Sequence, residues 1–284
     1  MPTDAVGPAS FLRHLDRWVP AALRRARRAT VALGYDGSDP QLAEQTVRVA
    51  GGYAARMPGC RLTVLVLADG TEELPARLGA AEAELPAEVA VHLMPGPPAR
   101  LPVALRAAGA LGGPVLSYLE TDDPVALTAA AVGRTAEALV VAGSATPLRE
   151  ALVDAGFALA TEVELIDADR RIGFGTGSDR SLEEMKENLW ESGARFRDPY
   201  GDPLSPAAPG ESAPLGRALL EELTRQGPRT VTELRRYAVT RTAYRAVDAT
   251  RALSDLLAAG QVTRSPQDGR LGGDVVVSAV RPGP

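Results

Sequence analysis

The sequence predicts an α/β chain in which a doubly wound, mostly parallel sheet of seven strands precedes a small C-terminal winged helix-turn-helix module. Three observations support this prediction. Short, continuous apolar runs alternate with helical stretches from residue 30 onwards, a pattern typical of parallel strands buried on both faces. A stretch rich in proline and glycine follows, and beyond it the pattern changes to three helices and two strands. With 284 residues, the chain is long enough for two such domains.

The chain opens with a predicted N-terminal helix, residues 1–29, whose apolar residues recur at helical spacing over 11–28 and which Pro20 is able to kink. It ends in a cluster of four arginines: Arg24, Arg25, Arg27 and Arg28. Because cations at a helix C-terminus offset the partial negative charge of its free carbonyl groups, we interpret this cluster as a helix end, with a nucleic-acid or lipid patch as the alternative.

The α/β domain is predicted to span residues 30–196. Its strands are expected at 30–33, 62–68, 89–94, 114–119, 138–142, 161–166 and 172–176. Its helices are expected at 40–56, 72–84, 99–108, 124–135, 147–155 and 181–191, the last opened by a capping box of Ser181 and Glu184. Strands that alternate with helices in this way are expected to lie parallel and to be joined by right-handed crossovers.

The last two strands are separated only by residues 167–171, too few for a crossover helix, so we expect an antiparallel hairpin there. A parallel sheet that ends in an antiparallel hairpin is typical of the class I methyltransferase fold, which is Rossmann-like.

Residues 197–214 are rich in proline and glycine and are predicted to be a linker. The predicted winged helix domain, 215–284, has helices at 215–225, 230–237 and 242–259, and strands at 261–265 and 273–280 around a turn at 266–272. Thr230 and Glu233 form a capping box that opens its second helix.

A class I methyltransferase holds S-adenosylmethionine at the carboxyl ends of its strands, beside a glycine-rich turn. Here the first turn contains Gly34, Tyr35, Asp36 and Gly37, and Asp69 follows the second strand, where an acidic side chain is placed to accept hydrogen bonds from ribose hydroxyls. These five residues are our candidates for cofactor binding. The turn has no GxGxxG pattern, so ordinary turns at both places are the alternative.

Three carboxylates follow the fourth strand, at Glu120, Asp122 and Asp123. Crowded carboxylates raise one another's pKa and can act as acid and base, so these are our candidate catalytic residues. The alternative is that Asp123, before Pro124, only starts a helix. No Asn-Pro-Pro-Tyr motif is present, which argues against a standard adenine- or cytosine-amino methyltransferase.

The predicted winged helix carries a positive charge on an acidic chain. Lys and Arg against Asp and Glu number 20 and 29 in residues 1–212, but 11 and 7 in residues 213–284. The candidate contacts to DNA or to a partner protein are Arg241, Thr242, Arg245, Arg251, Arg264 and Arg270. Asp248 and Asp255 interrupt the positive face of the third helix, so both kinds of partner stay open.

Metal, disulfide and membrane functions are not expected. One cysteine, Cys60, and two distant histidines, His14 and His92, exclude an intrachain disulfide and a closed zinc site of the usual kind. No apolar run approaches about 18 residues and no leader pattern is present, so we expect a cytoplasmic protein.

The most distinctive segment is residues 171–190, RIGFGTGSDRSLEEMKENLW. It resembles the strand-then-helix segment FATGSDxxLExMKxxMW of the three-Cys-motif partner (TcmP) family. The resemblance implies a class I methyltransferase-like domain with a C-terminal winged helix, and S-adenosylmethionine as the expected cofactor. Apolar residues at helical spacing here would belong to the core of any fold, so the segment indicates kinship and assigns no activity.

Two motifs depart from that family. Its first motif resembles YIDGFAGPG, which is shortened here to GYDGSDPQLA over residues 34–43, and its fourth-strand motif DPFG is replaced by ETDDP over residues 120–124. Both changes fall at the expected active site. A divergent member is therefore expected, either an S-adenosylmethionine-dependent methyltransferase or an inactive scaffold that binds DNA or a partner protein through its winged helix.

Overall fold

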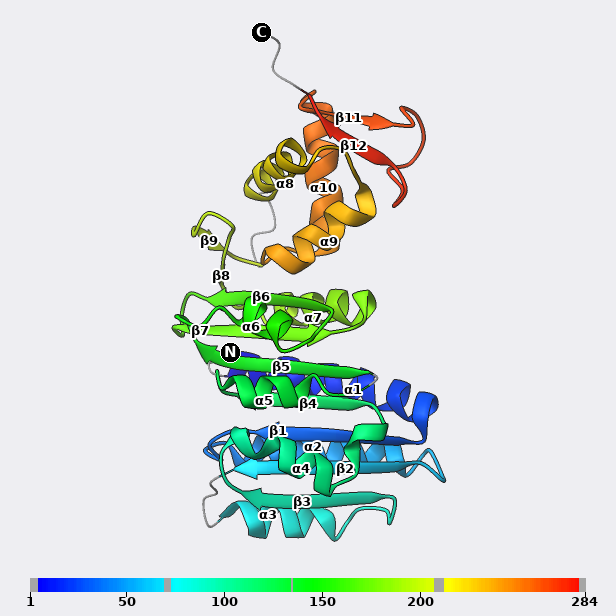
Figure 1. Ribbon diagram of the computed structural model, residues 1–284, viewed down its shortest axis with the longest axis vertical. Helices are drawn as coiled ribbons and strands as arrows, with labels where there is room; N and C mark the ends of the chain where they lie inside the picture. Colours follow the sequence, from blue (N-terminus) through cyan, green and yellow to red (C-terminus); the bar gives the residue numbers. More distant parts are fainter. Residues whose placement is uncertain (1–4, 69–72, 134, 207–211, 281–284) are drawn as a thin grey trace.

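A nine-stranded sheet runs through the first domain in the order β3-β2-β1-β4-β5-β7-β6-β8-β9 (Figure 1). The computed structural model describes residues 5–68, 73–133, 135–206 and 212–280. The strands are β1 (Arg28–Gly34), β2 (Arg61–Ala68), β3 (Val89–Pro95), β4 (Val115–Glu120), β5 (Ala136–Gly143), β6 (Leu159–Leu165), β7 (Arg170–Thr176), β8 (Phe196–Arg197) and β9 (Pro203–Leu204). Strands β1 to β5 are parallel, and β7 lies antiparallel between β5 and β6. The predicted α/β class, the mostly parallel sheet and the hairpin of its last two predicted strands are thus confirmed.

The expected strand number was wrong, because two further short strands form, one across the predicted border between domain and linker and one inside the predicted linker. Strand β8 pairs with the edge strand β6 through Phe196 and Leu165, and β9 pairs with β8. Phe196 is fully buried and Leu204 nearly so. The burial of these two side chains anchors the start of the proline-rich stretch to the sheet.

Helices cover both faces of the sheet. One face carries α1 (Val6–Ala26), α2 (Pro40–Ala54), α3 (Glu73–Glu82) and α7 (Asp179–Glu191), and the other carries α4 (Leu101–Ala107), α5 (Pro124–Ala130) and α6 (Leu148–Asp154) (Figure 1). Short 3-10 turns, η2 (Pro98–Arg100) and η3 (Ala110–Gly112), flank α4. Each face has its own apolar core, as expected for strands buried on both sides.

The N-terminal helix α1 is a part of the sheet domain. Its residues Phe11, Leu15 and Val19 are fully buried, and the Phe11 ring packs 5.2 Å from the ring of Tyr118 on β4. Pro20 lies inside the helix without ending it. Helix α1 runs antiparallel to β1. Its first residues therefore lie at the carboxyl ends of the parallel strands and its last residues at their amino ends.

The last helix of this domain, α7, begins differently from its prediction. Ser178 is the N-cap, and its side chain accepts a hydrogen bond from the Ser181 amide. Ser181 lies inside the first turn and donates its hydroxyl to Glu137. The predicted capping box of Ser181 and Glu184 was therefore wrong.

The C-terminal part consists of three helices and a small sheet. Its elements are α8 (Ala213–Gln226), β10 (Arg229–Thr230), α9 (Val231–Arg241), α10 (Ala246–Ala258), β11 (Val262–Ser265) and β12 (Val276–Ala279). Strand β12 lies between β10 and β11 and is antiparallel to both. The predicted capping box is present, because the Thr230 hydroxyl accepts from the Glu233 amide and the Glu233 carboxylate accepts from the Thr230 amide.

This C-terminal part packs against the β6 side of the sheet domain (Figure 1). The apolar core on the α1 and α7 side continues without a break into α8, α9 and α10. Thr161 on β6 donates a hydrogen bond of 2.6 Å to the carbonyl of Val239 on α9. The two parts are thus joined by buried contacts as well as by the chain.

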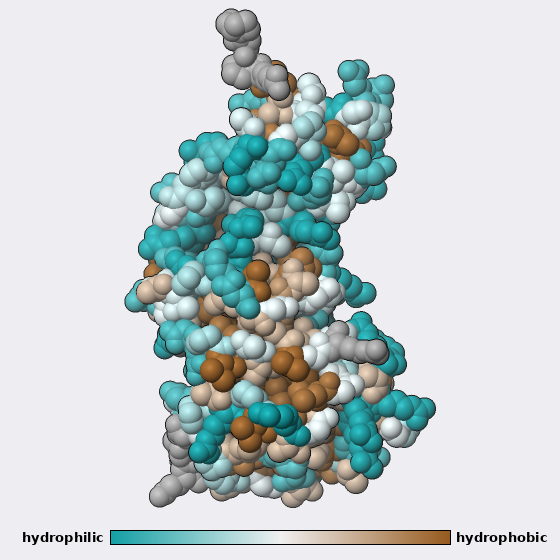
Figure 2. Space-filling model, in the orientation of Figure 1, coloured by the Kyte–Doolittle hydropathy of each residue, from teal (hydrophilic) through white to brown (hydrophobic). Residues whose placement is uncertain are grey.

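None of the described helices is both long and apolar enough to cross a membrane. Figure 2 shows apolar side chains gathered over the region of α4 and α5, which carry the exposed residues Val103 and Val125. This surface lies on the opposite face of the sheet from α1 and α7.

Candidate functional site

A cleft of about 390 Å³ opens at the carboxyl ends of β1, β4 and β5. Three carboxylates and one guanidinium line it, from Asp36, Asp39, Glu120 and Arg170. The chain runs from β1 outwards to β3 and returns to β4 on the other side of β1, so the strand order reverses at this point. In open α/β sheets, ligands bind at such a switch point.

The loop after β1 supplies two of the carboxylates. Gly37 has a φ of +82°, a left-handed conformation that favours glycine. The Asp36 carboxylate accepts a hydrogen bond of 2.8 Å from the Ser38 amide. Hydrogen bonding from the side chain and the backbone of Ser38 holds the pKa of Asp36 below its usual value. Asp39 is the N-cap of α2 and accepts from the Gln41 amide at 2.9 Å. Both side chains are held by the backbone at the rim of the cleft.

Glu120, at the end of β4, lies deeper. The buried Tyr118 donates its hydroxyl to Glu120 Oε1 at 2.7 Å. Burial raises the pKa of the Glu120 carboxyl, and the charges of Asp36 and Asp39 act in the same direction. The cleft therefore holds one carboxyl with a raised pKa and one with a lowered pKa, which is the arrangement expected of an acid and a base with different roles.

Arg170 is a cleft residue that the sequence did not point to. It lies in the segment that seemed to be only a hairpin turn, and it begins β7. Because β7 pairs with β5, Arg170 lies opposite Gly143 at the carboxyl end of β5. Its charge lowers the pKa of both Asp36 and Glu120. Only the strand order brings this cation to the cleft.

The other residues predicted for cofactor binding have different places. Tyr35 is buried and donates its hydroxyl to the Asp39 carbonyl at 3.1 Å. A Cβ at Gly34 would lie 2.9 Å from Leu119 Cδ2 and 3.2 Å from Pro98 Cβ, so side chains already cover Gly34. Asp69 lies outside the described residues.

Two of the three predicted catalytic carboxylates are not in the cleft. Asp123 is the N-cap of α5 and accepts from the Val125 amide at 2.8 Å. Asp122 is exposed and accepts from the Thr146 hydroxyl at 3.3 Å. Both follow the end of β4, and the start of α5 turns them away from the cleft. Only Glu120 of the predicted set lines it.

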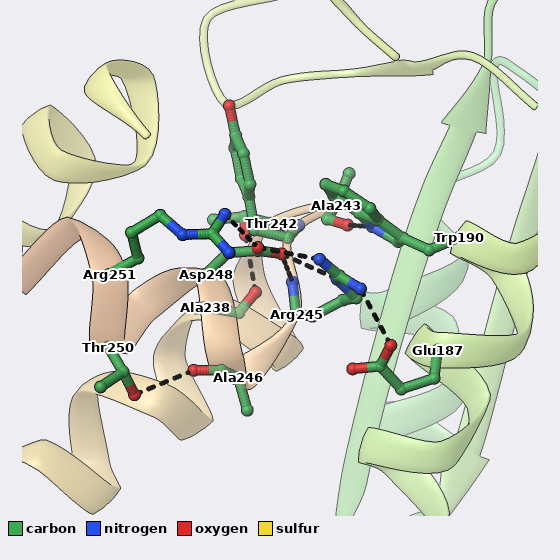
Figure 3. A network of polar contacts seen from close by, with 11 residues as sticks. Glu187, Trp190, Ala238, Thr242, Ala243, Arg245, Ala246, Asp248, Thr250 and Arg251 are labelled. Carbon is green, nitrogen blue, oxygen red and sulfur yellow. Dashed lines mark hydrogen bonds and ion pairs between the residues drawn. The ribbon is translucent and has the colours of Figure 1, made fainter. Parts of the chain in front are cut away.

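Thr242 and Arg245, predicted to face a duplex or a partner, face the sheet domain instead (Figure 3). The third helix begins at Ala246, because the extended backbone of the C-cap Thr242 ends α9 at Arg241. The Thr242 hydroxyl donates to the Ala238 carbonyl and accepts from the Tyr244 amide. Residues 242–245 form the turn between the two helices, and Thr242 is buried in it.

Arg245 is fully engaged within the molecule. Its guanidinium lies 4.2 Å from the centre of the Trp190 ring and donates to Glu187 at 3.1 Å, both on α7 (Figure 3). It also donates to the buried Asp248 at 3.0 Å. Arg245 therefore acts as a link between α7 and α10.

The four other predicted contact residues do not form one surface group. Arg241 is exposed at the end of α9, and Arg251 on α10 lies 3.5 Å from Asp248. Arg264 donates to the carbonyls of Pro266 and Asp268 and so holds the turn between β11 and β12 together. Arg270 is exposed in the same turn.

Within the described part of the chain, no group of three His, Cys, Asp or Glu side chains is placed to hold a metal ion. Comparison of the chain with known protein families found no matching family, and comparison with curated proteins found no similar sequence.

Proposed function

We propose that the chain is a class I methyltransferase-like protein whose cleft at the carboxyl ends of β1, β4 and β5 binds S-adenosylmethionine. The observation that carries this proposal is the placement of an antiparallel β7 between β5 and β6, with the cleft at the switch point beside β1. A dinucleotide-binding sheet has the order 3-2-1-4-5-6 without such an insertion. The same proposal includes kinship with the three-Cys-motif partner family.

The charges in the cleft suit this ligand. S-adenosylmethionine carries a sulfonium and an ammonium cation together with one carboxylate. Asp36, Asp39 and Glu120 offer negative charge to the cations, and Arg170 offers a partner to the carboxylate. The volume of about 390 Å³ falls within the roughly 300–1,000 Å³ typical of small-molecule sites.

The cleft differs from a site in which the glycines of a turn lie against the cofactor. Gly34 is covered by Leu119 and Pro98, and the Asp39 carboxylate already accepts from the first free amides of α2. An anionic group of a ligand is therefore excluded from that helix end, and Arg170 is the cation left for it. We infer that the ligand lies on the α1 side of the β1 loop.

Glu120 is the residue we assign to proton transfer. Bound S-adenosylmethionine supplies an electrophilic methyl group. Burial and neighbouring negative charge raise the pKa of Glu120, so its carboxylate is a better proton acceptor than a solvated glutamate. Tyr118 orients that carboxylate through its hydroxyl, and burial keeps the tyrosine protonated by raising its pKa. Asp36 stays charged and holds cationic groups.

We also propose that residues 213–279 form a winged helix, on the order α8, β10, α9, α10, β11, β12 and the three-stranded sheet. Because Thr242 and Arg245 are taken up by the contact with α7, we assign this module a fixed structural place beside the sheet. Duplex binding would have to use Arg241 of α9 and Arg251 of α10, without Thr242 and Arg245.

Calorimetric titration of the full chain with S-adenosylmethionine tests the proposal. Asp36→Asn and Glu120→Gln should each weaken binding by about tenfold, because each removes about 1.4 kcal/mol or more of attraction to a cation. Asp122→Asn is the matched control, since this exposed carboxylate belongs to the same end of β4 but lies outside the cleft. Its affinity should equal that of the wild type.

Absence of both heat and thermal shift in the wild-type chain at millimolar S-adenosylmethionine would overturn the proposal and favour the inactive scaffold. An equal loss in Asp122→Asn and Asp36→Asn would place the ligand elsewhere.

A further inference from the structure

We propose that a pocket between α1 and α7, at the amino ends of the parallel strands, binds a small anion of the phosphate class. The pocket measures about 240 Å³, and its cations come from Arg17, Arg24 and Arg25 of α1 and from Arg180 of α7. Its lining includes Pro114, just before β4, and Glu137, near the start of β5, so it lies at the opposite end of the strands from the carboxylate-lined cleft. It is independent of the site proposed for S-adenosylmethionine.

Three of the four arginines have no counter-charge. Arg180 donates to Glu184 at 2.8 Å. The side chains of Arg17, Arg24 and Arg25 are exposed, and their guanidinium groups make no hydrogen bond or ion pair with any described residue. Guanidinium groups gathered around one concavity repel one another, and they match the oxygens of phosphate or carboxylate in geometry and charge.

The end of α1 does not account for this cluster. Arg24 and Arg25 lie in the last turn of the helix, which ends at Ala26, and there they offset the helix dipole. Arg17 lies more than two turns before that end, where the dipole no longer acts. Its presence in the same pocket therefore calls for another explanation, and a bound anion supplies one.

His14 is a largely buried residue beside the pocket. His14 Nε2 lies 2.6 Å from Glu137 Oε2, but His14 Nδ1 is buried and has no hydrogen-bond partner among the described residues. The His14 side chain is only 2% exposed. Because Nδ1 is itself buried, it does not reach the open space of the pocket, and the arginines are the groups that would contact an anion.

Glu137 contributes negative charge to the lining but forms no ion pair with a described arginine of the pocket. Its carboxylate is taken up by His14 and by the hydroxyls of Thr176 and Ser181, at 3.2 and 2.8 Å. Ser181 and the N-cap Ser178 bring the start of α7 to the pocket, and the partial positive charge of a helix N-terminus adds to the field of the arginines.

The size of the pocket favours a small ligand. At about 240 Å³, it falls below the roughly 300–1,000 Å³ of sites for drug-sized molecules. It suits inorganic phosphate or the phosphate group of a small phosphomonoester, which share the same recognition chemistry.

Thermal unfolding and calorimetry of the full chain test this site, with inorganic phosphate and with glycerol 3-phosphate as probes and chloride at equal ionic strength as the reference. Each probe that binds the folded chain should raise the unfolding midpoint by mass action. The combined variant Arg17→Ala, Arg24→Ala and Arg25→Ala should bind more than about tenfold more weakly and show no rise. These side chains are exposed, so the variant keeps its fold.

Arg270→Ala is the matched control, because the Arg270 side chain is also exposed and forms no hydrogen bond or ion pair with a described residue, but lies in the C-terminal part. It should bind both probes as the wild type does. Tighter binding of glycerol 3-phosphate identifies an esterified phosphate as the ligand, and tighter binding of inorganic phosphate identifies the free anion. No midpoint rise in the wild type, an equal rise in the combined variant, or displacement of phosphate by a short DNA duplex would overturn the proposal.

Discussion

The first turn and the middle of α7 hold buried polar groups in opposite ways. At its first turn, Ser181 donates to Glu137, whose carboxylate also lies 2.6 Å from the His14 ring. One turn further along, Lys186 is fully buried, and its amine donates only to backbone carbonyls, of Thr242 at 2.6 Å and Glu162 at 3.4 Å. The first group is buried with an ionisable partner, and the second is buried among neutral acceptors.

This difference decides which group keeps its charge. Burial disfavours the charge of Glu137, but the hydrogen bonds from His14, Ser181 and Thr176 together with the charge of His14 hold its pKa below the usual value. Burial lowers the pKa of Lys186 to about 7, and nearby Glu162 only partly opposes this. Glu137 thus keeps its charge because donors and a cation surround it, whereas Lys186 loses its charge near neutral pH because burial outweighs its two neutral acceptors and nearby Glu162.

Lys186 is also the chain's single lysine, in a sequence whose other 30 basic residues are arginines. An arginine cannot lose its proton at any ordinary pH and has five N–H donors to satisfy. A lysine fits a buried site whose acceptors are two carbonyl groups, because it can become neutral. The position also explains part of the distinctive segment 171–190, since Lys186 and Trp190 hydrogen-bond the successive carbonyls of Thr242 and Ala243.

Removing the buried Glu137 carboxylate should have the largest effect on stability. Glu137→Ala leaves His14, Thr176 and Ser181 buried without their common acceptor, and removing one partner of a buried ion pair costs about 3–5 kcal/mol. Because the folded pKa of Glu137 is lowered, its contribution is present above its ordinary value of 4.5 and is lost as the pH falls through the folded value. Urea unfolding at neutral and acidic pH measures both effects.

Glu150→Ala is the control for that experiment. The Glu150 side chain is half exposed and pairs only with the neighbouring Arg149, so its loss should change the free energy of unfolding by no more than about 0.5 kcal/mol. Equal losses in the two variants would show that the polar cluster around Glu137 contributes no stability.

The charge state of the buried Lys186 is tested by varying the pH. The unfolded chain keeps the Lys186 proton up to about pH 10.5, whereas the folded chain releases it near pH 7. The unfolded state thus binds more protons between these values, and rising pH stabilises the folded state. From pH 7 to about pH 9, the free energy of unfolding of the wild type should rise by about 2 kcal/mol relative to Lys186→Met.

Urea unfolding of both chains across this range gives the measurement, and the pH dependence that they share cancels in the difference. A constant difference between the two chains would mean that Lys186 stays charged when buried. A difference that falls as the pH rises would mean that its folded pKa lies above that of the unfolded chain.

Local sequence patterns predicted most helices and strands. The elements that were not predicted depend on pairing or packing between distant parts of the chain. The capping box of Thr230 and Glu233 lies within four residues of sequence, so the start of α9 could be predicted. Phe196 becomes a strand residue only because the edge of β6 is free to pair with it, directly before a stretch whose prolines indicate a linker. The start of α10 was missed because the backbone becomes extended at Thr242 and ends α9, although the residue spacing after it still looks helical.

The candidate site shows the same limit. Glu120, Asp122 and Asp123 are equivalent in the sequence, and only the last residue of β4 enters the cleft while the start of α5 removes the other two. Arg170 reaches the cleft through the pairing of β7 with β5, which no local pattern contains. Composition predicted the acidic character of this domain, but not the separation of carboxylates and arginines to opposite ends of its strands.

An exposed charge pair on α7 sharpens the comparison. Arg236 on α9 forms two hydrogen bonds with Asp179 on the first turn of α7, at 2.8 and 2.6 Å, and both side chains are about half exposed. Solvent screens such pairs, so Arg236→Ala should cost under about 1 kcal/mol, and less at high salt. Urea unfolding at low and high salt measures this loss, with Arg241→Ala, an exposed arginine on the same helix, as the control. A salt-independent loss as large as that of Glu137→Ala would contradict the view that burial, more than geometry, sets the energetic weight of the contacts on α7.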